Sequence, residues 1–147
     1  MKSKIFVLLM VATSFLLLGA CSSAKPQYSV DAQYDEFAAV QETISRHVTK
    51  SIGVPAGSSF TVTLWSNQTT GFKWSESAMI GDQTILQQTD HKYVAAEAKE
   101  VVGAAGNEVW TFKAVKAGTT MVSMEYSQPW EGGQKDAFGF FLTVNVK

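Results

Sequence analysis

The chain has 147 residues, 46% of them hydrophobic, with 12 basic and 13 acidic side chains. This length fits one domain that buries its own core without disulfides or metals. The near-neutral charge argues against a nucleic-acid binder, which needs a basic patch to neutralise phosphates. One cysteine and two histidines remove most metal and thiol chemistry from consideration.

The first twenty residues have the pattern of a secretory signal peptide. Lys2 and Lys4 precede an apolar run over residues 5–18, which is shorter than the ~20 residues that cross a bilayer as a helix. The run ends in Leu-Gly-Ala followed by Cys21, which resembles the lipobox of bacterial lipoprotein precursors. This resemblance implies cleavage before Cys21 and a lipid on its thiol. The alternative is an ordinary signal peptide followed by a chance cysteine.

The segment after Cys21 is expected to be a tether. Residues 22–27 are small or polar with one proline, which suits a flexible linker. Ser22 is not the aspartate that retains lipoproteins in the inner membrane, so the resemblance implies an outer-membrane anchor if the source is Gram-negative.

Residues 29–48 allow two interpretations. Four apolar residues lie near helical spacing: Phe37, Val40, Ile44 and Val48. A short helix explains this spacing, and a first strand packed on the domain explains it equally well.

From residue 59 onward, apolar residues alternate with polar ones, as in strands that have one face on a core. Turn signals containing Gly, Pro or Asn separate these segments. The expected strands are residues 59–66, 72–79, 84–100, 108–116, 120–127 and 138–146. Several short strands without strong helical windows predict an all-β sandwich.

The order of these strands predicts where their connections lie. If successive strands alternate in direction, residues 67–71, 101–107 and 128–137 share one end of the sandwich. The other end then receives only residues 80–83 and the tight turn at 117–119. Loops that cluster at one end of a rigid sandwich commonly present a binding surface.

The three clustered loops resemble the motifs of one family. Residues 67–72 read Asn-Gln-Thr-Thr-Gly-Phe and are followed by Trp74, which resembles the Asn-Pro-Thr-Thr-Gly-Tyr/Phe motif of the chagasin family of cysteine peptidase inhibitors. The family's Gly-x-Gly-Gly and Arg-Pro-Trp motifs correspond to Gly-Ala-Ala-Gly at 103–106 and Gln-Pro-Trp at 128–130. The resemblance covers residues 49–147 and implies an immunoglobulin-like β-sandwich.

The resemblance also implies the function. The first loop would fill the catalytic cleft of a papain-like cysteine peptidase, with Thr69 and Thr70 nearest the reactive thiol, while the other two loops grip the walls. Inhibition would be reversible occlusion by a monomer that needs no cofactor or metal. The implied peptidase-binding residues are Asn67, Gln68, Thr69, Thr70, Gly71, Phe72, Gly103, Ala104, Ala105, Gly106, Gln128, Pro129 and Trp130.

The chain departs from the family pattern at three places. Gln68 replaces proline, so the first loop loses a fixed φ and its ordering on binding costs more entropy. Ala104 and Ala105 restrict the approach of the second loop's backbone. Gln128 replaces arginine and loses a charged group that can bind in bidentate fashion. These changes bear on affinity and target range more than on the class of function.

The loop residues also make physical sense without the family. Asn67 can hydrogen-bond its own turn, Gly71 can supply a positive φ, and both hold Thr69 and Thr70 at the tip. Trp130 is the kind of residue that most often anchors interfaces. The alternative is an ordinary β-turn with a tryptophan packed against the edge of the sandwich.

Other candidate sites are weaker. His47 and His91 lie outside the three loops and are expected to be solvated or structural. Glu131 and Asp136 flank a glycine pair, where two acids are more often solvating groups than a catalytic pair. Packing roles are expected for Trp65, Trp74 and Trp110. An enzyme is therefore not expected, and the competing class is a non-inhibitory adhesion or envelope-assembly lipoprotein that uses the same loops.

Overall fold

A computed structural model of the chain describes residues 28–39, 46–96 and 103–147. The expected signal peptide, the lipobox and Cys21 lie outside these residues, as does the tether. In chain order the elements are β1 (Tyr28–Ala32), α1 (Tyr34–Ala39), β2 (His47–Val54), β3 (Ser59–Ser66), η1 (Gln68–Thr70), β4 (Lys73–Trp74), β5 (Met79–Ile80), β6 (Leu86–Val94), β7 (Gly106–Ala114), β8 (Gly118–Ser127) and β9 (Phe138–Val146).

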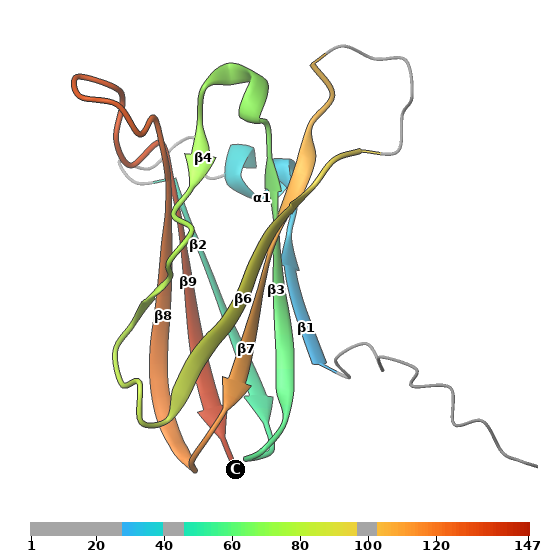
Figure 1. Cartoon of the computed structure of the whole chain (residues 1–147), viewed down its shortest axis with the longest axis vertical. Coiled ribbons are helices and arrows are strands. Elements are labelled where there is room, and N and C mark those ends of the chain that lie inside the picture. Colours follow the sequence, from blue (N-terminus) through green and yellow to red (C-terminus); the bar gives the residue numbers. More distant parts are fainter. Residues whose placement is uncertain (1–27, 40–45, 97–102) are drawn as a thin grey trace, which may run out of the picture.

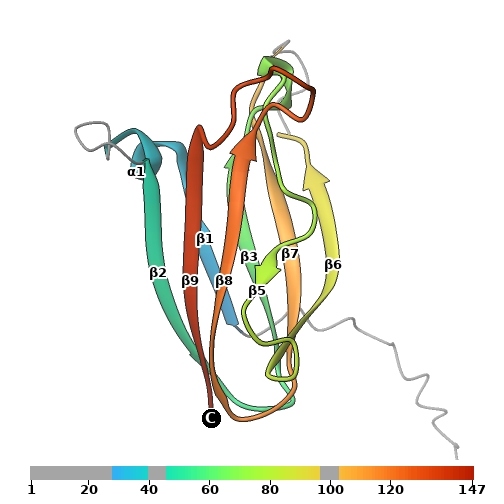
Figure 2. The same cartoon turned by 90° about the vertical axis from the view of Figure 1, so that its left-hand side faces the viewer.

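The strands form two sheets that pack face to face, which confirms the predicted all-β sandwich (Figures 1 and 2). One sheet has the order β1-β3-β7-β6, and the other has the order β2-β9-β8-β4, with β5 also paired to β8. Most pairs are antiparallel, but β1 runs parallel to β3 and β2 runs parallel to β9. Both sheets are therefore mixed.

The core is built by the alternation that the sequence shows. In β3 every second residue is buried, beginning with Phe60, and β7 has the same pattern with Trp110 and Phe112 fully buried. Strand β9 places Phe140 and Leu142 opposite them from the second sheet. Within this core the ring of Tyr126 packs against those of Trp74 and Phe138.

Residues 29–48 form both of the structures that the sequence left open. Strand β1 buries Val30 and Ala32, α1 buries Phe37, and Val48 lies in β2. The remaining residues of the helical spacing, Val40 and Ile44, lie outside the described residues. The sandwich therefore begins at β1 and includes chain before residue 49, where the resemblance begins.

Lysine 50 joins the three N-terminal elements. Its ammonium lies 2.7 Å from the Glu36 carboxylate of α1 and donates to the Asp31 carbonyl of β1. The hydrogen bond from Lys50 lowers the pKa of Glu36 from its ordinary value. Figure 2 shows α1 beside the start of β2, which is the position that this ion pair requires.

The expected strand over residues 72–79 is interrupted, and this part of the prediction is wrong. Within this range only β4 and the first residue of β5 belong to strands, both paired to β8, and several backbone groups between them bond to side chains instead. Trp110 Nε1 donates to the carbonyls of Ser75 and Glu76. The amide of Gln88 accepts from Ala78 N–H and donates to Glu76 O, both at 2.8 Å.

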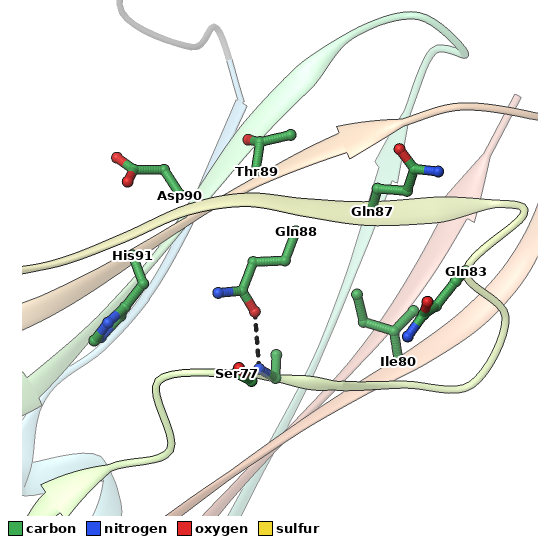
Figure 3. A pocket seen from close by; sticks show the side chains of 9 residues that line it. Ser77, Ile80, Gln83, Gln87, Gln88, Thr89, Asp90 and His91 are labelled. Atoms are coloured by element: carbon green, nitrogen blue, oxygen red, sulfur yellow. Dashed lines mark hydrogen bonds between the residues drawn. The ribbon is translucent and has the colours of Figure 1, made fainter.

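Figure 3 shows Gln88 reaching across from β6 to this segment. A mostly polar hollow of about 510 Å³ lies on either side of the bridge, lined by residues that include Ser77, Gln87 and Asp90. The expected strand over 84–100 is the shorter β6, which has an irregularity between Gln88 and Asp90. Residues 97–100 of that expected strand lie outside the described residues.

Candidate functional site

The three loops singled out from the sequence lie at one end of the sandwich. Strands β3, β6 and β8 run toward this end and β7 and β9 run away from it. Figure 1 shows the turn after β3, the start of β7 and the β8–β9 connection at the end opposite the C-terminus. The alternating direction of the strands thus predicts correctly that the three loops lie at the same end. We call this end the loop end.

The first loop is a single turn of 3-10 helix capped at both ends. The side chain of Asn67 accepts from Thr69 N at 3.2 Å, as an N-cap does. Gly71 closes the turn with φ +80°, a left-handed conformation that favours glycine. Both conformations agree with what the residue types predict.

The two threonines at the tip have hydroxyls that are already bonded within the loop. Thr69 Oγ1 donates to Asn67 Oδ1 and Thr70 Oγ1 donates to Asn67 O, both at 2.6 Å. Both residues are exposed. The loop is therefore a small-residue projection that its own hydrogen bonds hold in a turn.

Tyr126 of β8 holds the first loop to the sandwich, a role that the sequence did not reveal. Its buried phenol accepts from Asn67 N at 3.0 Å and donates to Asn67 O at 3.2 Å. Burial raises the pKa of this phenol, and the hydrogen bond with the Asn67 backbone opposes the increase. Phe72 stacks on the same ring at 5.5 Å. The signal for this role in the sequence was that Tyr126 lies at an inward-facing position near the end of an expected strand.

The third loop places Trp130 directly against the first. Its side chain is 49% exposed, and its ring lies so close to Gly71 that a Cβ there would be 2.6 Å from Trp130 Cη2. A Cβ on Gly133 would similarly lie 2.9 Å from Trp130 Nε1. The indole therefore fits between two glycines, with about half of its surface left to solvent.

Gln128, which stands where the family pattern has arginine, forms hydrogen bonds within its own loop. Its side-chain oxygen accepts from Gln134 N at 2.9 Å, and its backbone N–H donates to Gln134 O at 2.8 Å. The side chain thus bonds the β8–β9 connection across its base, where an arginine would offer only donors.

The second loop lies beside the tip of the first. Gly103 has φ +88°, and a Cβ on it would lie 3.8 Å from Thr69 Oγ1. Ala104 and Ala105 are half-buried. Gly106 begins β7 so close to β6 that a Cβ would lie 2.4 Å from the Val94 carbonyl oxygen. All three loops therefore meet around residues 69–71.

A hollow of about 320 Å³ lies between the first loop and the N-terminal part of the domain. Its lining includes Thr70 and Phe72 from the first loop and its exit, and Tyr34 and Arg46 from the N-terminal part of the domain. The Arg46 guanidinium lies 5.8 Å from the centre of the Phe138 ring, which also lines the hollow. Aromatic side chains thus continue from the loops onto the N-terminal elements.

The remaining candidates have structural partners. His91 Nε2 lies 2.9 Å from Glu108 Oε2, and this buried carboxylate also accepts from Ser66 Oγ and Trp74 N. His47 Nε2 lies 3.2 Å from Asp136 Oδ1. The sequence could have indicated this structural role of Glu108, because it is the one acidic residue of β7 and lies at an inward-facing position.

Asp136 forms its hydrogen bond with His47 rather than with Glu131. Trp74 and Trp110 are fully buried, and Trp65 is half-buried. In the part of the chain that the structure describes, no group of three or more His, Cys, Asp or Glu residues could hold a metal ion. Over the same residues, no helix has the length and apolar character needed to span a bilayer.

Comparison with known proteins gives consistent matches. The model of a family described as chagasin family peptidase inhibitor I42 matches residues 53–144. Chagasin of Trypanosoma cruzi is 30% identical over 111 residues, which cover 69% of this chain and 100% of that protein.

Two solved structures have the same fold. The cysteine protease inhibitor EhICP2 of Entamoeba histolytica superposes with a TM-score of 0.60 at 18% identity, covering 83% of this chain and 99% of its own. PbICP-C, solved in complex with falcipain-2, gives a TM-score of 0.59 at 14% identity, covering 82% of this chain and 99% of its own.

Proposed function

The chain belongs to the chagasin family of peptidase inhibitors, and from this membership we propose that it inhibits papain-like cysteine peptidases by reversibly occluding their catalytic cleft. Members of this family are inhibitors and not enzymes. The partner class is supported by the cysteine protease inhibitors among its structural relatives, one of which was solved in complex with falcipain-2.

The observation that carries the proposal is the contact among the three loops. Thr69 adjoins Gly103, and Gly71 lies beneath the ring of Trp130, so three separate stretches of sequence form one continuous surface. Loops that support one another in this way bind with a smaller cost in ordering entropy than isolated loops do. A protease–inhibitor interface buries about 1,600 Å² in total, of which three short loops can supply one side.

The conformation of the first loop supports occlusion without cleavage. Its backbone follows a 3-10 turn from Gln68 to Thr70, and both threonine hydroxyls are bonded to Asn67. A tightly turned peptide does not lie extended across a cleft, so no carbonyl carbon is aligned with an attacking thiolate. We therefore place Thr69 and Thr70 beside the reactive thiol as blocking groups that form no bond with it.

The fold also suits display from a lipid anchor on Cys21. Strand β1 begins at Tyr28, which pairs with Phe60 near the start of β3, at the end of the sandwich away from the loops. A tether that joins the domain there leaves the loop end directed away from the membrane. In a Gram-negative source we place the anchor in the outer membrane.

A panel of peptidases tests the proposal directly. The soluble fragment 22–147 is titrated against several papain-family enzymes, with trypsin as a serine-peptidase control. We expect competitive, reversible inhibition of at least one papain-family enzyme at nanomolar concentration, which corresponds to roughly −12 kcal/mol. Unchanged activity across the panel at micromolar concentration would contradict the proposal and favour an adhesion or envelope-assembly role for the same loops.

A further inference from the structure

We propose that Lys135 is a positioning residue for inhibition: its ammonium clamps the β8–β9 loop so that Trp130 is already seated on the first loop before a peptidase binds. This inference rests on the proposed function and adds a residue that lies outside the three loop motifs. Lys135 is exposed and lies five residues after Trp130, on the returning arm of the same loop.

The clamp consists of two hydrogen bonds from one cation. Lys135 Nζ donates to the carbonyl of Gln128 at 2.5 Å and to the carbonyl of Trp130 at 3.1 Å. The Trp130 carbonyl also accepts from Gly133 N at 3.2 Å. Hydrogen bonds from an ionised donor are stronger than those between neutral groups. One side chain thereby fixes the backbone on both sides of Pro129.

Nearby acids do not compete for this ammonium. Among the described residues, no carboxylate lies within ion-pair distance of Lys135. Asp136 is directed to His47, and the Glu125 carboxylate accepts from the backbone N–H of Asp136. The partners of the cation are therefore carbonyl oxygens of its own loop, which is the arrangement expected of a loop clamp.

The clamp acts on the residue that joins two loops. With its carbonyl held, Trp130 lies with its ring against Gly71 and Gly133, where neither glycine has a Cβ to exclude it. Gln128 supplies no charge, and its side chain is bonded to Gln134. Lys135 thus carries the positive charge of this loop, and its hydrogen bonds hold the backbone of Trp130.

Loss of the clamp should lower the fraction of molecules whose loop is ready to bind. Apparent affinity falls in proportion to that fraction, while the complex, once formed, dissociates at its former rate. We expect Lys135→Met to reduce the association rate constant about tenfold, which corresponds to about one molecule in ten having a seated Trp130. The dissociation rate constant should change by less than about twofold.

The experiment compares Lys135→Met and Lys135→Arg with Lys113→Met. Lys113 is a matched control because its ammonium also donates to a backbone carbonyl, that of Gly57, at the end of the sandwich away from the loops. Association and dissociation rates are measured by biosensor against a papain-family peptidase. Fluorotryptophan NMR of the free protein then reports the environment of Trp130, whose resonance is assigned with Trp130→Phe.

Support requires three results together. Lys135→Met slows association and moves the Trp130 resonance toward that of a solvated indole, Lys135→Arg restores both, and Lys113→Met alters neither. An unchanged Trp130 resonance in free Lys135→Met overturns the inference, even if binding weakens, because the lysine then contacts the peptidase directly. If the wild-type chain inhibits no peptidase, the proposed function fails, while the NMR comparison still decides whether the clamp exists.

Discussion

At the scale of single residues, we expect Trp130 to matter more for binding than for folding. Its ring is half-exposed and packs on glycines at the surface, so Trp130→Ala should lower the free energy of unfolding by about 1 kcal/mol, less than the truncation of a fully buried tryptophan does. The same substitution should weaken inhibition by about 2 kcal/mol, roughly thirtyfold, because the rest of the ring is desolvated only in the complex. Urea unfolding and an inhibition titration on the same protein measure both quantities.

Trp110 is the matched control for that substitution. It is fully buried, and its indole N–H donates to the carbonyls of Ser75 and Glu76. Trp110→Ala should cost about 3–5 kcal/mol of folding free energy. If Trp130→Ala unfolded the domain as Trp110→Ala does, the indole would belong to the core and the surface of the loop end would lose its anchor.

Gln68 is the residue at which restoring the family pattern should help. It is the first residue of the 3-10 turn, a position where proline is favoured because the first N–H of a helical turn has no partner within it. Gln68→Pro should tighten binding by about 0.4–1 kcal/mol by removing freedom from the unbound loop. Inhibition constants of the folded proteins measure this, and tenfold weaker binding would mean that Gln68 makes a contact of its own.

At the scale of elements, the N-terminal strands and helix are part of the sandwich and not an addition to it. Strand β2 pairs along its whole length with β9, and β1 covers the edge of β3. A fragment of residues 49–147 lacks Val30, Ala32 and Phe37, all of them core residues. We expect it to be unfolded or at least several kcal/mol less stable than fragment 22–147, because each large core truncation costs about 2–5 kcal/mol.

Circular dichroism and thermal melts of the two fragments test this expectation. A cooperative melt of fragment 49–147 near that of the longer fragment would show that β1 and α1 contribute little. Residues 53–144 match the family model, so the result also tells how much chain beyond that region the fold requires.

At the scale of the whole molecule, the three loops and the start of β1 lie at opposite ends of the sandwich. An anchor on Cys21 would thus hold the inhibitor at a surface without covering its loops. We propose that a lipid is added to the Cys21 thiol, and we therefore expect Cys21→Ser to abolish lipidation. Metabolic labelling with a fatty-acid analogue should mark the wild-type protein alone, and equal labelling of the variant would refute the anchor.

Much of the architecture follows from local sequence. Alternation of apolar residues gives the bounds of β3 and β9 correctly, because the period of a strand decides which side chains face the core. The cap at Asn67 and the positive φ at Gly71 follow from the chemistry of those two residues. Alternating strand direction then suffices to bring the three loops to one end.

Contacts between distant residues decided the rest. Three features depend on contacts between separate elements. They are the parallel pairing of β1 with β3 and of β2 with β9, the hydrogen bonds that join residues 75–78 to Trp110 and Gln88, and the hydrogen bonds between Tyr126 and Asn67. No periodicity encodes such contacts, since each depends on where a partner lies in space. The sequence by itself determined which residues form the loops, and the tertiary structure decided that Trp130 rests on Gly71, because only packing brings an indole to a glycine that has no Cβ to exclude it.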